Sequence, residues 1–140
     1  MKNKSILVIA GEPNSIFLEI FFKSIKYKKF KSPIILICCK KILTHQMRKN
    51  KIIKKINTLE INKLENYNLD NNNINLIDIE CHKINGIFNP KFTNEYLYNS
   101  FELAIKLIKK KFTHKLINGP IIKKNIFKKK IFRDYRIYFS

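Results

Sequence analysis

The sequence predicts an α/β fold with a largely parallel sheet and helices on both faces. Short apolar runs occupy residues 5–10, 34–38 and 74–79. Such runs are typical of strands that are buried on both faces of a parallel sheet. Between the first two runs, and again after the second, apolar residues recur at spacings of three and four, which is the helical period. This alternation of strands and helices indicates β-α-β units.

In the first half of the chain, a helix is expected after each of two strands. A turn at residues 11–14 ends the first strand, and the first helix starts at Ser15 with an apolar side made of Phe17, Ile20, Phe21 and Ile25. Pro33 marks the entry to the second strand. Residues 40–56 are predicted to form a basic amphipathic helix that docks on the sheet through Ile42, Leu43, Met47, Ile52, Ile53 and Ile56.

In the second half, residues 57–73 are predicted to form a short edge strand and then a loop centred on 71–73, where three asparagines follow one another. A strand at 74–79 comes next. A long helix from Thr93 to Lys111 is expected to bury Leu97, Phe101, Ala104, Ile105 and Ile108. A short strand at 115–118, a Gly119-Pro120 turn and a helix from Ile121 complete the order β-α-β-α-β-β-α-β-α.

The composition is strongly basic, with 29 Lys and Arg against 10 Asp and Glu and a net charge of +19. Such a charge usually indicates a nucleic-acid partner. However, the abundant Lys, Ile, Asn, Phe and Tyr all have codons rich in A and T, so a biased genome would produce the same composition. There are only three arginines, Arg48, Arg133 and Arg136, although phosphates and base edges favour the guanidinium group. We therefore expect no specific nucleic-acid partner, and only weak non-specific binding at low salt.

Cysteines, histidines and hydropathy favour a cytoplasmic protein without its own metal site. Cys38, Cys39 and Cys81 form no CxxC pair and are predicted to be buried free thiols in a reducing compartment. The three histidines, His45, His82 and His114, are far apart in the sequence. No apolar run approaches the ~18 to 20 residues of a membrane span, and the amino terminus resembles a signal peptide only in its charge.

Two loops are candidates for chemistry because each lies between a predicted strand and a predicted helix, where open-sheet enzymes bind ligands. The backbone amides of such a loop and the helix amino terminus can bind a phosphate, and a lysine one turn into the second helix could face it. The candidate residues are Gly11, Glu12, Asn14, Asn118, Gly119 and Lys123. Alternatively, the first loop is a plain turn capped by Ser15 or Asn14, and Lys123 is a surface lysine. Neither loop is a GxGxxG or Walker motif.

Together the two loops resemble motifs of the 4-hydroxythreonine-4-phosphate dehydrogenase family. That family opens with Gly-Asp/Glu-Pro-x-Gly-Ile-Gly and an acidic residue; the matches here are Gly11, Glu12, Pro13, Ile16 and Glu19, whereas Ser15 and Phe17 replace two glycines. Its second motif is Thr-Gly-Pro-x-x-Lys, which is matched by Gly119, Pro120 and Lys123, with Asn118 in the threonine position. Asn94, Tyr96 and Ala104 resemble residues of the helix that precedes this motif. The resemblance covers nearly all of this chain but only an amino-terminal part of the family's length.

The resemblance implies part of a two-domain, homodimeric, NAD-dependent oxidoreductase of pyridoxal phosphate (vitamin B6, or pyridoxine) biosynthesis. The family reaction is the oxidation and decarboxylation of 4-phosphooxy-L-threonine, a small phosphorylated hydroxy amino acid. A divalent metal (zinc, magnesium or cobalt) polarises the forming carbonyl. The family's three histidine ligands for this metal all correspond to positions after residue 140, so the metal ligands are absent from this chain. We therefore expect the fragment to be inactive on its own.

The carboxyl end departs from the family, which continues with Gly-His-Thr-Glu where this chain has Phe132 and residues 133–138. Arg-Asp-Tyr-Arg-Ile-Tyr can be written AGG GAT TAC AGA ATA TAT, which, read one base later, gives Gly-Ile-Thr-Glu-Tyr. We therefore predict that residues 1–132 are the amino-terminal α/β portion and that 133–140 are a frameshifted, non-native tail. Two alternatives stay open: a small basic α/β nucleic-acid-binding module, and a non-functional pseudogene product with an exposed apolar sheet edge.

Overall fold

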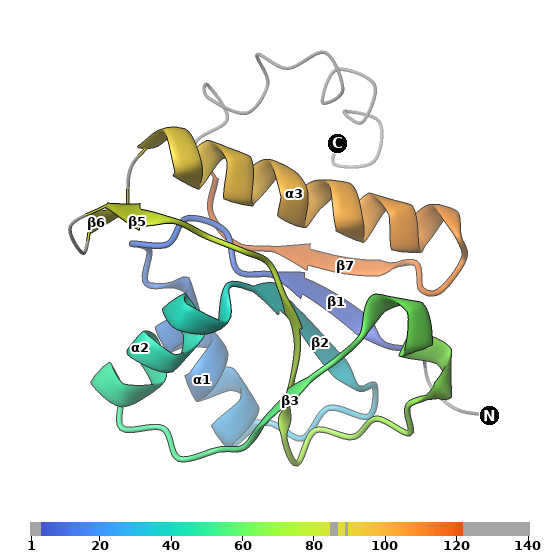
Figure 1. Ribbon diagram of the computed structural model, residues 1–140. Helices are drawn as coiled ribbons and strands as arrows, with labels where there is room; N and C mark the ends of the chain where they lie inside the picture. Colours follow the sequence, from blue (N-terminus) through green and yellow to red (C-terminus); the bar gives the residue numbers. More distant parts are fainter. Residues whose placement is uncertain (1–3, 85–86, 89, 122–140) are drawn as a thin grey trace.

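A five-stranded, wholly parallel sheet forms the centre of the molecule in the computed structural model, which describes residues 4–84, 87–88 and 90–121 (Figure 1). The strand order is β3-β4-β2-β1-β7. The strands are β1 (Ile6–Ile9), β2 (Ile34–Cys38), β3 (Ile56–Thr58), β4 (Ile74–Asp78) and β7 (Lys115–Asn118). A separate antiparallel pair, β5 (Lys83–Ile84) and β6 (Ile87–Phe88), follows β4.

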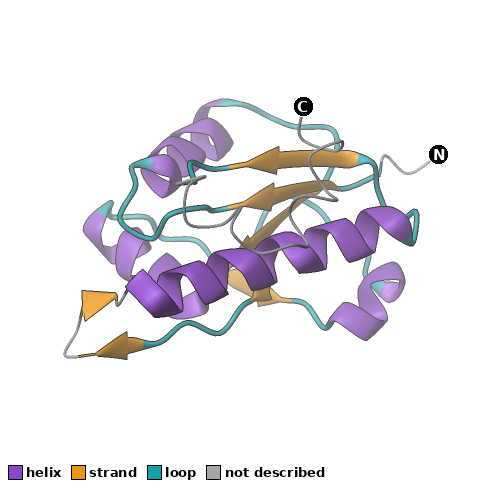
Figure 2. Ribbon diagram, turned by 90° about the horizontal axis from the view of Figure 1, so that it is seen from above, coloured by secondary structure: helices purple, strands orange, loops and turns teal. Residues whose placement is uncertain are grey.

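Helices cover both faces of the sheet, which confirms the predicted fold class. They are α1 (Phe17–Tyr27), α2 (Lys40–Lys49) and α3 (Pro90–Lys109), with a 3₁₀ helix, η1 (Ile61–Asn66), between β3 and β4. The chain moves in one direction across the sheet from β1 to β2 to β3, and α3 carries it back from β4 to β7. Because such crossovers are right-handed, α1 and α2 lie on one face and α3 on the other (Figures 1 and 2).

The core is densest at the middle of the sheet, where β2 is buried at all five positions. This strand has β1 and β4 as hydrogen-bonded neighbours and helices on both faces, so an uninterrupted apolar sequence is what its position requires. Each large apolar side chain removed from water stabilises the fold by roughly 1.5–3 kcal/mol. The fully buried set includes Leu7, Ile9, Ile35, Leu36, Ile37, Leu76, Ile77, Leu97 and Phe101.

Two helix predictions were partly wrong. Helix α1 buries Leu18, Phe21 and Phe22, whereas Ile20, which we placed on the apolar side, is 50% exposed. The predicted helix at 40–56 ends at Lys49, because Lys51 adopts a left-handed φ of 54° that terminates the helix. Downstream, Ile53 is fully exposed and Ile56 begins β3, the predicted edge strand.

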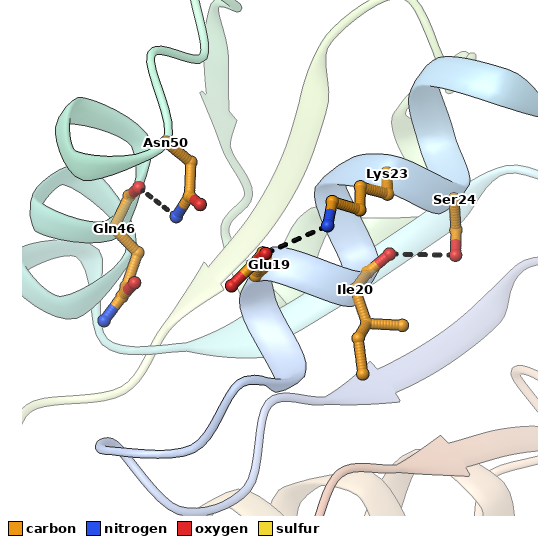
Figure 3. A network of polar contacts seen from close by, with 6 residues as sticks. All are labelled: Glu19, Ile20, Lys23, Ser24, Gln46 and Asn50. Carbon is orange, nitrogen blue, oxygen red and sulfur yellow. Dashed lines mark hydrogen bonds and ion pairs between the residues drawn. The ribbon is translucent and has the colours of Figure 1, made fainter.

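The predicted Asn14 or Ser15 cap of α1 was also wrong. Ile16 occupies the N-cap position, and the Ser15 hydroxyl accepts a hydrogen bond from the Phe17 amide at 3.3 Å. Further along α1 and at the end of α2, short polar contacts support the exposed helix surfaces (Figure 3). They are the Glu19–Lys23 ion pair at 3.0 Å and the hydrogen bonds from Ser24 to the Ile20 carbonyl and from Asn50 to the Gln46 carbonyl.

In the second half of the chain, the long helix starts at Pro90, earlier than predicted, and buries Leu97, Phe101, Ala104 and Ile105 as expected, whereas Ile108 is only partly buried. The 3₁₀ helix η1 and the β5–β6 pair were not predicted from the sequence. The strand at 115–118 is confirmed, and residues 71–73 form the predicted loop. The helix expected from Ile121 onward lies outside the described residues.

Candidate functional site at the carboxyl edge of the sheet

The two loops that the sequence singles out lie side by side at the carboxyl edge of the sheet. Strands β1 and β7 are parallel neighbours with Ile9 opposite Asn118, so the residues after them emerge together. Two backbone hydrogen bonds join the loops. The Gly119 amide donates to the Ile9 carbonyl at 2.7 Å, and the Glu12 amide donates to the Pro120 carbonyl at 2.9 Å.

Both glycines are required by this backbone-to-backbone contact. Gly11 has a φ of +78°, and a Cβ there would lie 2.5 Å from the Pro120 carbonyl oxygen. A Cβ at Gly119 would collide with the Ala10 carbonyl oxygen and lie 3.0 Å from Cγ of Phe17. Real Cβ atoms do not approach other atoms so closely, so no residue larger than glycine fits either position without movement of the backbone. The two motifs therefore interlock.

The polar groups of the interlocked loops reach solvent unequally. Asn14 and Asn118 are exposed and Glu12 is half-buried. The Asn118 side-chain amide donates to the Gly119 carbonyl at 3.1 Å. Three amides of the first loop, those of Glu12, Ser15 and Phe17, already donate hydrogen bonds within the protein. An anion held here would have to use other donors, and the sixth candidate, Lys123, lies outside the described residues.

The ends of β2 and β4 add polar groups that the sequence pattern did not predict. The Asp78 carboxylate, at the end of β4, accepts a hydrogen bond from the Lys40 amide at 2.8 Å and so caps the start of α2. This cap comes from a residue 38 positions away, which no local capping pattern could reveal. His82 lies nearby, with Nε2 3.9 Å from a Glu80 carboxylate oxygen and its ring centroid 5.3 Å from that of Phe92.

The prediction of three free thiols was wrong for two cysteines. Cys39 and Cys81 form a disulfide that ties the start of α2 to the segment after β4, while Cys38 is free and buried. Parallel pairing of β2 with β4 brings the two residues together, although 42 positions separate them in the sequence. The predicted reducing compartment rested on unpaired cysteines, and the disulfide removes that argument. The cytoplasmic location stays a prediction.

Cys38 is not a nucleophile in this environment. Burial raises the pKa of its thiol to about 12, although a hydrogen bond with Tyr96 opposes the change, so the thiol is protonated at neutral pH. Burial also raises the pKa of Tyr96, whose hydroxyl accepts a hydrogen bond from the Cys39 amide at 3.4 Å. These two side chains form part of the packing beneath the carboxyl edge.

No metal centre is evident in the part of the chain that the structure describes. Among those residues, no three His, Cys, Asp or Glu side chains are grouped so that they could hold an ion. His45 lies on α2, His82 follows β4 and His114 precedes β7, at the other end of the sheet. Within the same described ranges, no helix is long and apolar enough to cross a membrane.

Comparisons with known proteins give a match in structure only. Neither a family model nor a curated protein matches the sequence. A 4-hydroxythreonine-4-phosphate dehydrogenase from Burkholderia phymatum has a TM-score of 0.72 and 14% identity, and covers 89% of this chain and 38% of its own length. A putative 4-hydroxythreonine-4-phosphate dehydrogenase from Salmonella typhimurium has a TM-score of 0.73 and 15% identity, and the match covers 89% of this chain and 40% of that protein. The 4-hydroxythreonine-4-phosphate dehydrogenase from Klebsiella pneumoniae has a TM-score of 0.72 and 18% identity, and the match covers 89% of this chain and 39% of that protein.

The chain thus spans about two fifths of the length of the dehydrogenases it matches. At these identities the likeness is one of fold. In fold, the chain resembles an amino-terminal fragment of a 4-hydroxythreonine-4-phosphate dehydrogenase, as the two loop motifs led us to expect.

Proposed function

We propose that this chain is the amino-terminal part of a 4-hydroxythreonine-4-phosphate dehydrogenase. The observation that carries the proposal is that the two loops with the family's motifs, far apart in sequence, interlock on adjacent strands at the carboxyl edge. Open α/β sheets bind their ligands at this edge. The motif residues and the likeness in fold to solved dehydrogenases both support this proposal.

In this proposal, the complete enzyme has two domains, forms a homodimer and oxidises and decarboxylates 4-phosphooxy-L-threonine with NAD and a divalent metal. This chain contributes the interlocked loops and a substrate-facing edge with Asn14 and Asn118. The described residues do not fit a metal, so we derive no step through it for this chain. The metal ligands and most of the cofactor site would come from a further polypeptide segment, and the 140-residue chain is inactive by itself.

Strand β7 forms an outer edge of the sheet in the described part of the chain. Among the described residues, β7 pairs only with β1, and Ile117 is 52% exposed. In this proposal, the further polypeptide segment covers this edge. The alternative of a non-functional gene product predicts the same edge, so only an activity measurement separates the two.

The test starts from the gene. We would sequence the DNA through the codons for Lys130 to Ser140 and beyond, and express any reading frame that resumes with Gly-Ile/His-Thr-Glu and later histidines. NADH formation from 4-phosphooxy-L-threonine would be followed by absorbance, with zinc, magnesium or cobalt present. We expect the restored chain to be active and the 140-residue chain to be inactive. Unrelated sequence after residue 140, or a restored chain that forms no NADH, would overturn the proposal.

A matched pair of lysine variants tests the second loop in the restored chain. Replacing Lys123 by Ala should raise the KM for the phosphorylated substrate at least tenfold, because a charge-assisted contact with phosphate contributes about 1.5–3 kcal/mol. Lys106→Ala, on the exposed side of α3 beside Glu102, removes the same charge and should leave the KM unchanged. If the two variants change the KM equally, Lys123 does not contact the substrate phosphate and is an ordinary surface lysine.

A further inference from the structure

The opposite, amino edge of the sheet carries two adjoining cavities of about 390 and 420 Å³. They share Lys31, Pro33 and Leu69, so together they form one groove, which we call the amino-edge groove. In Figure 1 this edge is the one near the N label, and in Figure 2 the strand arrows point away from it, toward β5 and β6. The groove is therefore separate from the carboxyl-edge loops of the proposed dehydrogenase.

The groove is positively charged. Four lysines line it, Lys4, Lys28, Lys29 and Lys31, against two acids, Glu65 and Asp70. The Asp70 carboxylate already accepts hydrogen bonds from the backbone and side-chain amides of Asn72. The lysines come from the segment before β1 and from the turn between α1 and β2, which the fold brings to one place.

Aromatic rings line the same groove between the lysines. Phe30, in the second cavity, is 36% exposed. Tyr67 and Phe112 are half-buried in the wall of the first cavity. Grooves that bind single-stranded nucleic acid have two components. Lysines contact the phosphates, and aromatic ring faces stack against the bases.

The lysine-bearing turn is held in place by Asn71. Its side-chain amide donates to the carbonyls of Phe30 at 3.2 Å and Ser32 at 2.9 Å, and its side-chain oxygen accepts a hydrogen bond from the Ile34 amide at 2.8 Å. These three contacts fix the backbone on both sides of Lys31. A fixed turn loses less conformational entropy when a ligand binds.

We propose that the amino-edge groove binds single-stranded nucleic acid without sequence preference, with lysines on the phosphates and aromatic rings against the bases. Among the described residues that line the groove there is no arginine, the residue whose bidentate guanidinium group most often reads bases, so we expect no sequence preference. The rings share the groove with charged side chains instead of forming an apolar face, which favours a nucleic acid over a membrane surface.

The experiment uses the full 140-residue chain and a fluorescein-labelled oligouridine of twelve nucleotides, with binding followed by fluorescence anisotropy. If four lysines displace counterions, log K should fall against log salt with a slope of about −2.8, so affinity should drop roughly 50-fold between 50 and 200 mM KCl. The triple variant Lys28→Gln, Lys29→Gln, Lys31→Gln should bind at least about tenfold more weakly at 50 mM KCl, with a slope shallower by about 2.

The matched control is Lys40→Gln, Lys41→Gln, Lys49→Gln, which removes three exposed lysines from α2 and changes net charge equally. We expect its affinity to stay within twofold of the parent. If both triple variants weaken binding equally, the lysine-rich surface acts as a whole and the proposal is wrong. Circular dichroism would verify that each variant is folded.

A second pair of variants tests base stacking. Phe30→Ala should weaken oligouridine binding at least about fivefold with an unchanged salt slope, because stacking contributes about 1–3 kcal/mol per base. Tyr27→Ala, which removes a 75% exposed ring outside the groove, should have no effect. If Phe30→Ala binds normally and inorganic polyphosphate competes as well as unlabelled oligouridine, the groove is a general polyanion site and not a nucleic-acid site. Neither readout depends on dehydrogenase activity.

Discussion

The two edges of the sheet are built in different ways. At the carboxyl edge, the loops after β1 and β7 contact each other through their backbones, and a disulfide and the Asp78 cap join the ends of β2 and β4. At the amino edge, a side-chain amide, that of Asn71, holds the turn, and two cavities remain open. Motif residues at the first edge therefore have a packing role before any role in binding.

This difference predicts how each edge tolerates substitution. A backbone contact between glycines leaves no room for an added side chain, so the carboxyl edge should be sensitive even to a single methyl group. The amino edge should tolerate changes of its exposed lysines and lose stability mainly when Asn71 is removed. Four measurements of the free energy of unfolding test this contrast.

The largest loss is expected for Gly11→Ala at the carboxyl edge. Its Cβ would meet the Pro120 carbonyl in a left-handed conformation, and the clash and the backbone strain together should cost about 4 kcal/mol. Denaturant unfolding would measure it. Asn14→Ala, in the same loop but exposed, should change stability by less than about 0.5 kcal/mol. Equal stabilities of the two variants would show that the loops do not interlock.

The disulfide at the same edge should contribute somewhat less. Cys81→Ser opens a covalent link across 42 positions, and the lost restriction of the unfolded chain should cost about 3 kcal/mol. A reducing agent should destabilise the parent by the same amount and leave the variant unchanged. If a reducing agent does not change the unfolding midpoint of the parent protein, the Cys39–Cys81 disulfide is not present.

At the amino edge, Asn71→Ala should cost about 2 kcal/mol, because it leaves the Ile34 amide and two carbonyls without their partner at a half-buried position. Asn72→Ala is the control, since Asn72 is exposed and its hydrogen bonds within the described residues go to nearby Asp70. If the proposed groove depends on the fixed turn, Asn71→Ala should also weaken oligouridine binding while Asn72→Ala does not. Indistinguishable variants would mean that the turn is held by other contacts.

At neutral pH the smallest effect is that of Cys38, beneath the carboxyl edge, because its contribution to stability changes only at alkaline pH. The unfolded thiol ionises above its ordinary pKa of 9.0, while burial keeps the folded thiol protonated up to a pKa of about 12. The folded state then binds more protons, so stability falls as pH rises between these values, with a slope that approaches about 1.4 kcal/mol per pH unit. The difference between the parent and Cys38→Val isolates this contribution from the lysines. Parallel pH profiles of the two proteins would contradict it.

From the sequence alone, the fold class and the main strands were predictable. The runs at 34–38 and 115–118 became β2 and β7, and the edge strand and the long helix were also found. Local patterns sufficed here because a strand covered on both faces must be apolar at every position, whereas a helix with one covered face shows the 3.6-residue period. The same residues led to the two loops and to the family that the chain resembles in fold.

Only the tertiary structure determined the contacts between segments that are distant in the sequence. Only the pairing of β1 with β7 brings Gly11 against Pro120, and only the pairing of β2 with β4 brings Cys39 to Cys81. The helix expected at 40–56 failed because the chain had to leave α2 early enough to form β3 at the sheet edge. Likewise, the sequence is rich in lysine throughout, so no single lysine stands out. Only the fold places some of these lysines beside aromatic rings in one groove. Sequence periodicity reports which face of an element is covered, but the contacts between distant segments depend on strand order, which the tertiary structure sets.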